Sequence, residues 1–173
     1  MRRRAAVMAG PGPGSVPLVR FAVPGECVAV LPAGSGDAPG GASDRATVGL
    51  LLRRGNLFDH LTVARNVVLA GRLAGRPLRT ADDLLELVGL AGRGDDYPGT
   101  LSALESARAG VAVVLAGAPD TVVADEPAGE LDGLAALELM DLLCAVAARG
   151  TAVVVATRDP EIAAAAHRIV RVA

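Results

Sequence analysis

The chain has 173 residues, 51% of them hydrophobic, with 17 Lys+Arg against 19 Asp+Glu and a formal net charge of −2. This length and composition fit one globular domain spanning 1–173 and argue against disorder. The small negative charge provides no basic surface for a phosphate backbone, so nucleic acid is not an expected partner. The sequence contains no lysine and no glutamine, which excludes any mechanism that needs either side chain.

The first part of the chain predicts three strands. Leu18 to Val23 alternates imperfectly between apolar and polar residues and precedes a turn at Pro24-Gly25. Cys27 to Leu31 and Thr47 to Leu52 are continuous apolar runs, which are typical of parallel strands buried on both faces. The intervening segment, Pro32 to Ala46, is rich in Gly, Ser, Pro and Asp and shows no helical periodicity.

Capping residues mark the helices that follow. Thr62 and Thr80 each precede an apolar pattern with helical spacing, and the second of these helices is expected from Ala81 to Val88. The two helices form a small helical insert at about 62–100. Ser102 to Glu105 is a capping box that opens a third helix.

The last third of the chain alternates between strands and helices. Strands are expected at Thr121 to Ala124 and Thr151 to Ala156, with a long helix between them that begins after Asp132. A short helix starting at Asp159-Pro160 precedes a last strand, Arg168 to Val172. This alternation predicts a doubly wound α/β sheet.

Targeting, membrane and metal signals are weak. The Gly/Pro run 10–14 interrupts the N-terminal apolar segment before the h-region of about 7–15 residues that a signal peptide needs. The longest apolar stretch, Ala109 to Pro119, is shorter than the ~20 residues of a membrane span. Cys27 and Cys144 each lie in an apolar run without C-x-x-C or His-rich spacing, so both are expected to be buried hydrophobes rather than a metal or redox site.

Five segments occur in a fixed order along the chain. They are Leu31-Pro32-Ala33-Gly34-Ser35-Gly36-Asp37-Ala38, Asn56-Leu57-Phe58-Asp59-His60-Leu61-Thr62-Val63, Leu101-Ser102, Val122-Val123-Ala124-Asp125-Glu126-Pro127 with Leu131-Asp132, and Val155-Ala156-Thr157-Arg158-Asp159-Pro160. This order and spacing resembles the ATP-binding subunits of ABC transporters, in particular the small subunits of export and lipoprotein-release type. The resemblance covers about Gly25 to Val172 and implies a P-loop NTPase-like, mostly parallel sheet with ATP and Mg²⁺ as cofactors.

The phosphate loop of that family, G-x-x-x-x-G-K-[ST], is only half present. Gly34, Ser35 and Gly36 survive, but Asp37 stands at the lysine position and Ala38 at the position of the hydroxyl that holds Mg²⁺. One unit-charge pair at ~4 Å and an effective dielectric constant near 20 is worth about 4 kcal/mol. Replacing this attraction by a repulsion is therefore expected to weaken triphosphate binding by several powers of ten.

The interval after the phosphate loop is also short. Only residues 37–46 separate Gly36 from the next strand, and Pro39, Gly40 and Gly41 disfavour a helix there. The resemblance implies that the helix after the loop and a small antiparallel arm are both missing. The helix dipole that would attract the phosphates is then lost as well.

The resemblance assigns four further positions one at a time. Asp125 matches the carboxylate that holds Mg²⁺ through water, and Glu126 matches the catalytic carboxylate that orients the attacking water. Arg53 stands where the family has a glutamine that links the γ-phosphate to the membrane partner. Arg158 stands where a histidine contacts the γ-phosphate.

The signature segment, which in the family closes over the nucleotide of the opposite subunit, reads Leu101-Ser102-Ala103-Leu104-Glu105. Two glycines that permit close backbone approach have become Ala103 and Leu104, and the glutamine has become Glu105. Ser102 is a nucleotide-binding candidate by the resemblance, and the helix needs it as an N-cap in any case.

These departures predict a truncated, degenerate ATP-binding subunit with weak or no ATP binding and hydrolysis. The resemblance implies a membrane permease subunit and a second ATP-binding subunit as partners, and a cytoplasmic location on the inner face of the cell membrane. Two alternative interpretations remain open. One is a working ATPase that drives export, with Arg53 or Arg158 replacing the lysine. The other is a non-catalytic interaction protein or a decayed gene product.

Overall fold

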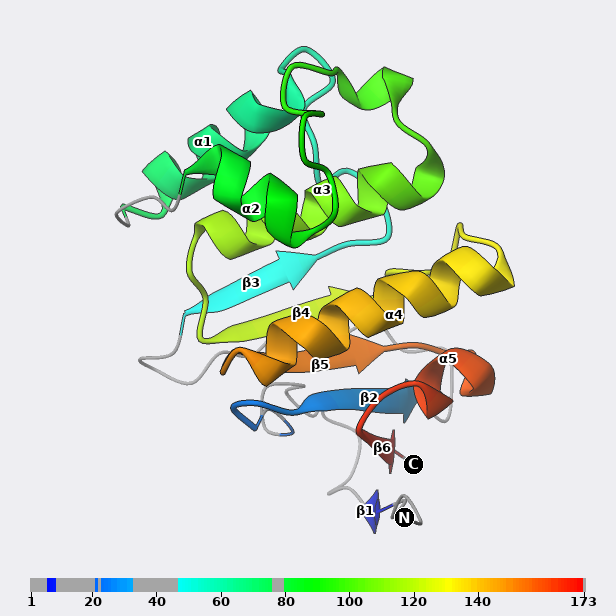
Figure 1. Cartoon of the computed structure of the whole chain (residues 1–173). Coiled ribbons are helices and arrows are strands. Elements are labelled where there is room, and N and C mark those ends of the chain that lie inside the picture. The colour runs from blue at the N-terminus through cyan, green and yellow to red at the C-terminus, as the bar shows by residue number, and fades with distance from the viewer. Residues whose placement is uncertain (1–5, 9–20, 22, 33–46, 76–79, 173) are drawn as a thin grey trace.

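Six parallel strands form one sheet in the order β1-β6-β2-β5-β4-β3 (Figure 1). The computed structural model describes residues 6–8, 21, 23–32, 47–75 and 80–172. The strands are β1 (Ala6–Met8), β2 (Cys27–Pro32), β3 (Val48–Leu51), β4 (Thr121–Asp125), β5 (Ala152–Ala156) and β6 (Arg168–Val172). Each neighbouring pair of these strands is parallel, which confirms the predicted α/β class.

The helices begin where the capping residues predict. They are α1 (Val63–Leu73), α2 (Ala81–Leu87), the 3-10 helix η2 (Pro98–Thr100), α3 (Ala103–Ala116), α4 (Gly133–Ala148) and α5 (Pro160–Ala164). The side chains of Thr62, Ser102 and Asp132 each accept a hydrogen bond from the backbone N–H three residues later. These bonds satisfy donors that an open helix end leaves unpaired.

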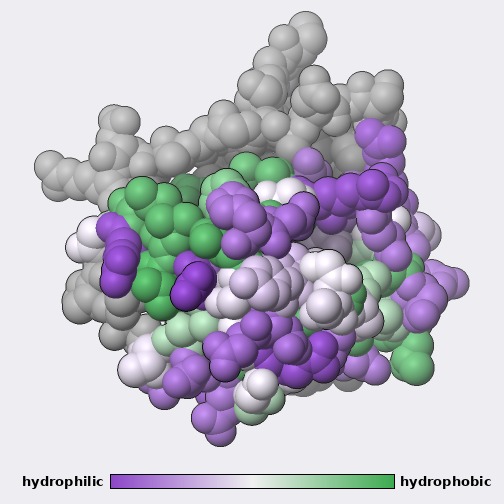
Figure 2. All heavy atoms as spheres, turned by 90° about the horizontal axis from the view of Figure 1, so that it is seen from above, coloured by the Kyte–Doolittle hydropathy of each residue, from purple (hydrophilic) through white to green (hydrophobic). Residues whose placement is uncertain are grey.

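The helical insert lies on α3. Both α1 and α2 pack against α3, which in turn lies over β3 (Figure 1). Val63 and Val67 of α1 and Leu84 and Leu85 of α2 are buried in the same apolar core. The view from above shows a mostly polar surface with hydrophobic side chains gathered on one side (Figure 2).

The described helices cover one face of the sheet. The strand residues that share a core with all five described α-helices are Cys27, Ala29, Leu51, Val122, Ala124, Val153 and Val155. A second set of strand residues forms a separate buried cluster with Phe21. These residues are Val28, Val30, Val123, Val154, Ala156 and Val170. Among the described residues, α-helices therefore line one face of the sheet. Most of the connection from β2 to β3, residues 33–46, lies outside the described residues, so the doubly wound arrangement stays a prediction. The segment 37–46, for which no helix was predicted, lies outside them.

Two strand predictions need correction. Phe21 and Val23 are not in a strand, and the rest of the segment 18–23 lies outside the described residues. The strand at Val48–Leu51 is an edge strand rather than one buried on both faces, because Leu51 is 2% exposed while Leu50 is 53% exposed. The apolar run alone could not reveal that no described strand pairs with β3 on its far side.

None of the helices in the described part of the chain is long and apolar enough to cross a membrane.

Candidate functional site

The candidate residues gather at the carboxyl ends of three neighbouring strands. Asp125 ends β4 and pairs in register with Ala156, the last residue of β5. The N–H of Thr157 donates to the carbonyl oxygen of Val30 in β2 at 3.1 Å. Ligands of open α/β sheets bind outside the carboxyl ends of the strands, so this edge is the place to look for a site.

The phosphate-loop candidates follow β2 in the sequence. Gly34, Ser35, Gly36, Asp37 and Ala38 lie outside the described residues, and their assignment stays a prediction. The shortened interval 37–46 also lies outside them, so the loss of the helix and of the antiparallel arm stays a prediction as well.

Glu126 occupies a backbone conformation that side chains disfavour. Its φ of 44° lies in the left-handed region, which costs a non-glycine residue roughly 1–2 kcal/mol. The N–H of Glu126 donates to the carbonyl oxygen of Ala156 at 2.9 Å, and this bond fixes the turn that follows β4.

The carboxylate of Glu126 is already hydrogen-bonded within the chain. Its Oε1 accepts from the backbone N–H of Arg158 at 2.9 Å, and its Oε2 accepts from the Thr157 hydroxyl at 3.2 Å. Glu126 therefore joins the loop after β4 to the loop after β5. A carboxylate held in this way is less available to orient water, and its role as general base stays a prediction.

By the resemblance, one of the donors expected for Mg²⁺ bound to a triphosphate is missing from the sequence. Phosphate-loop ATPases supply a Ser or Thr hydroxyl, and the sequence has Ala38 at that position. Asp125 is half-buried at the end of β4, and both carboxylate oxygens of Glu126 accept hydrogen bonds from the loop after β5. Among the residues that the structure describes, no group of three or more His, Cys, Asp or Glu side chains could hold a metal.

Arg53 is held against the loop that follows β4. Its Nη2 donates to the carbonyl oxygen of Gly129 at 3.3 Å, and its Nε lies 3.2 Å from Oε1 of Glu130. Arg54 pairs with the same carboxylate. For Arg158, the structure brings the backbone N–H and not the guanidinium to Glu126. The structure therefore brings together Asp125, Glu126 and the backbone of Arg158, with Arg53 on the adjoining loop.

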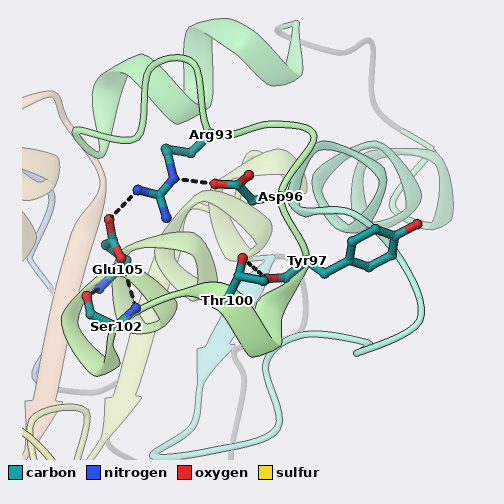
Figure 3. Close-up of polar contacts among 6 residues, drawn as sticks. All are labelled: Arg93, Asp96, Tyr97, Thr100, Ser102 and Glu105. Carbon is teal, nitrogen blue, oxygen red and sulfur yellow. Dashed lines mark hydrogen bonds and ion pairs between the residues drawn. The ribbon is translucent and has the colours of Figure 1, made fainter.

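Ser102 forms the predicted capping box at the start of α3 (Figure 3). The Ser102 hydroxyl accepts from the N–H of Glu105 at 3.2 Å, and a Glu105 carboxylate oxygen accepts from the N–H of Ser102 at 2.8 Å. The helix N-terminus, a favoured position for anions, thus already carries the carboxylate of the chain's own Glu105.

The sequence did not predict that the Arg93 guanidinium lies beside this capping box. Arg93 lies between Glu105 and Asp96 and pairs with both, with 3.0 Å between its Nη1 and Oε1 of Glu105 (Figure 3). The backbone and side-chain hydrogen bonds with Ser102, together with the Arg93 charge, hold the pKa of Glu105 below its usual value. No local signal links Arg93 to Glu105, because their approach depends on how the insert folds back onto α3.

A surface pocket of about 340 Å³ lies beside the Arg53 loop. Three segments line it, namely residues of 51–59 after β3, residues of 98–107 around the start of α3, and Pro127, Glu130 and Leu131 after β4. Phe58 follows the lining residue Leu57, is 55% exposed, and contacts the ring of His60.

Asn66 fixes the loop that carries Phe58. The Asn66 side chain is buried in α1 and accepts from the N–H of Phe58 at 2.7 Å. Its Nδ2 donates to the carbonyl oxygens of Phe58, Leu61 and Thr62. The exposed aromatic ring is therefore presented from a loop whose backbone is held in place.

Comparisons with known proteins agree with the motifs. No protein-family model matches the chain. It is 36% identical over 132 residues to the macrolide export ATP-binding/permease protein MacB of Shigella flexneri, and 35% identical over 132 residues to MacB of Escherichia coli K12. Each match covers 74% of this chain and 20% of the relative, so the chain spans about a fifth of the length of these relatives.

The fold also matches solved ABC cassettes. A dimeric structure of the cassette MJ0796 bound to ADP and Pi has a TM-score of 0.66 at 22% identity, covering 85% of this chain and 81% of that chain. A second dimeric MJ0796 structure has a TM-score of 0.66 at 23% identity, covering 87% and 82%. In its motifs, its relatives and its fold, the chain is similar to the ATP-binding domains of ABC transporters.

Proposed function

We propose that this chain is a degenerate ABC-type subunit that docks to a membrane permease and does not turn over ATP. The observation that carries the proposal is that groups expected to serve phosphate chemistry are already bound to other groups of the chain. The Glu126 carboxylate is bound to the β5 loop, Arg53 to Glu130, and Ser102 to Glu105.

The charges at the expected phosphate positions argue against tight ATP binding. Asp37 replaces the lysine that would attract the β- and γ-phosphates. Glu105 adds a second carboxylate at the signature helix, which in the family faces the nucleotide of the opposite subunit. Arg53, one of the two arginines offered above as substitutes for the lysine, is already paired with Glu130.

The docking surface is the pocket beside the Arg53 loop together with Phe58. Exposed aromatic residues often anchor protein interfaces, and Phe58 is 55% exposed on a loop that Asn66 fixes. The pocket carries charges of both signs, from Arg53 and Arg54 and from Asp59 and Glu130. By the resemblance, the segment Arg53 to Thr62 with the helices to Val88 matches the membrane-coupling face of the family, and this surface includes part of that segment. The chain would then act at the cytoplasmic face of the membrane, beside a second ATP-binding subunit.

Equilibrium binding of Mg²⁺–ATP to the purified chain tests the first half of the proposal. We expect no saturable binding at physiological nucleotide concentrations, and phosphate release at background. Micromolar affinity would overturn this half and favour the interpretation as a working ATPase.

Site-specific photocrosslinking tests the second half. Phe58 is replaced by a photoreactive benzoyl-phenylalanine in cells that express the chain with its permease. Leu134, which is 71% exposed on α4, takes the same replacement as a matched control. We expect a covalent adduct with an integral membrane protein from position 58 and none from position 134. Equal adducts from both positions would remove the docking assignment.

A further inference from the structure

Helix α1 presents two arginines on the side that points away from the core. Its buried residues are Val63, Asn66, Val67 and Gly71. Arg65 and Arg72 are both exposed, and their spacing along the helix places them on one face. Because α1 packs against α2 and α3, this face lies on the outside of the helical insert (Figure 1).

Three apolar side chains lie on the same side of α1 as the two arginines. Val68, Leu69 and Leu73 follow at the helical spacings that bring side chains together on one face. Leu73 is 78% exposed, and Val68 and Leu69 are half-buried. The outer face of α1, which we define as Arg65, Val68, Leu69, Arg72 and Leu73, is therefore both cationic and apolar.

The charge of this part of the chain is not balanced locally. Residues 60–81 contain four arginines and no acidic residue, in a chain whose formal net charge is −2. Arg65 and Arg72 are the two of these that the structure describes. Within the described part of the chain neither of them forms an ion pair, whereas Arg108 and Arg168 each pair with a glutamate. The two charges on α1 are thus available to an external anion.

The composition of the outer face favours a lipid surface as that anion. Basic residues with aliphatic side chains on the same face are typical of helices that lie in the headgroup layer of a membrane. A helix of a partner protein docks in a groove, but the outer face contributes no residue to the pocket beside the Arg53 loop or to the pocket between α2, α3 and α4. Leu73 instead projects from the surface, as a side chain that enters a bilayer must.

The position of α1 beside the Phe58 loop agrees with a membrane contact. Phe58 precedes α1 by a few residues, and Asn66 of α1 holds its backbone. Helix α1 has 11 residues, which corresponds to a length of about 16 Å. A permease bound at Phe58 and a bilayer at the outer face of α1 would therefore meet neighbouring surfaces of the chain.

We propose that the outer face of α1 binds the anionic surface of a lipid bilayer. Arg65 and Arg72 bind lipid phosphates, and Leu73 inserts at the boundary between headgroups and acyl chains. Each arginine near an anionic bilayer strengthens binding roughly fivefold, and salt screens this attraction. With two arginines and few apolar side chains the contact is weak and reversible, and it requires neither ATP nor a permease.

Co-sedimentation of the purified full chain with lipid vesicles tests the proposal, in the absence of nucleotide and permease. We expect the chain to sediment with vesicles that contain phosphatidylglycerol and phosphatidylcholine, and to stay in solution with pure phosphatidylcholine. Raising NaCl to about 0.5 M should release it, because exposed charges are screened over a few ångströms at that concentration. Sedimentation with neither lipid, or equally with both, would overturn the proposal.

Neutral substitutions locate the electrostatic part of the contact. Arg72→Gln should weaken binding to the anionic vesicles roughly fivefold. The matched control is Arg171→Gln, which removes the same charge from an exposed position on β6, away from the helical insert. Equal binding by the two variants would place the contact elsewhere, for example at the arginines 2–4 of the sequence, and would refute the role of α1.

A second pair of variants tests the apolar part. Leu73→Gln keeps the charge and should weaken binding severalfold, since less apolar surface then enters the bilayer. Leu134→Gln, at a position 71% exposed on α4, is the control and should bind like the parent. Unchanged binding by Leu73→Gln would refute the insertion of this side chain.

Crosslinking from Phe58 separates this inference from the proposed function. Vesicle binding without a permease adduct supports the lipid contact and removes only the docking proposal. A permease adduct that Arg72→Gln abolishes, from a chain that does not bind vesicles, would assign the outer face of α1 to a protein partner and overturn the lipid contact.

Discussion

Replacing Glu126 separates a structural role of this carboxylate from a catalytic one. Glu126→Ala removes the hydrogen bonds to the N–H of Arg158 and to the hydroxyl of Thr157. A hydrogen bond to a charged group contributes about 1.5–3 kcal/mol to the free energy of unfolding. Because Glu126 is half-buried, water replaces part of this contribution, and we expect a net loss of about 1–2 kcal/mol.

Two further substitutions at Glu126 distinguish the side chain from the backbone. Glu126→Gly loses the same hydrogen bonds, but glycine adopts the φ of 44° without steric cost. We therefore expect it to be about 1 kcal/mol more stable than Glu126→Ala. Glu126→Gln retains an oxygen for the N–H of Arg158 and gains an N–H₂ group that can donate to Thr157. Its stability should lie within about 1 kcal/mol of the parent.

Urea unfolding followed by circular dichroism measures this order, and each kcal/mol corresponds to a change of about 2–4 °C in Tm for a chain of this length. Phosphate release from Mg²⁺–ATP is measured on the same preparations and is expected at background for all four proteins. A parent that hydrolyses ATP and a Glu126→Gln variant that does not would identify a catalytic base and refute the structural role. Equal stability of the alanine and glycine variants would refute the argument from backbone strain.

Three further predictions concern the Phe58 loop, the signature helix and the phosphate loop. Asn66→Asp places a carboxylate oxygen against three backbone carbonyl oxygens in a site that is 3% exposed, and should lower the free energy of unfolding by about 3 kcal/mol in urea. The less buried Asn56→Asp is the control, and an equal loss there would contradict the argument. Glu105 has a pKa lowered from 4.5, so its contribution to stability is present above that value and lost as the pH falls through the folded-state pKa. Glu105→Gln should therefore reduce the fall of Tm with acid, and an unchanged Tm profile would show that the capping box contributes nothing through charge. Asp37→Lys combined with Ala38→Ser should bind ATP weakly at best, as measured by equilibrium titration, because no helix is expected after the loop; steady hydrolysis by this variant would show that two point defects are the only lesion.

Local signals in the sequence located most of the elements. The two capping boxes, Thr80 with Asp83 and Ser102 with Glu105, depend on residues only three positions apart, and both are present in the structure. The apolar run from Cys27 likewise gives β2 to within one residue. The exposure of Leu50 was not predictable, because it depends on which elements cover each face of the sheet rather than on the run in which Leu50 lies.

In the candidate site too, the features set by neighbouring residues were predictable and those set by distant contacts were not. The position of Asp125 and Glu126 at the end of a strand follows from the apolar run that precedes them. The partners of Glu126 come from the loop after β5, the next strand in the sheet, and the partner of Arg53 comes from the loop after β4. Such contacts depend on the order of the strands and on the path of the loops, which a single sequence does not specify.

The position of β2 in the sheet has a consequence for synthesis of the protein. β2 lies between β5 and β6, and the backbone of Cys27 is hydrogen-bonded to the ring of His167, 140 positions later in the sequence. A nascent chain therefore leaves the backbone edges of β2 unpaired until almost all of the described residues have left the ribosome. During this interval the strand can pair with another nascent chain, so the yield of soluble protein should depend on chaperone supply and on translation rate more than on the stability of the finished fold.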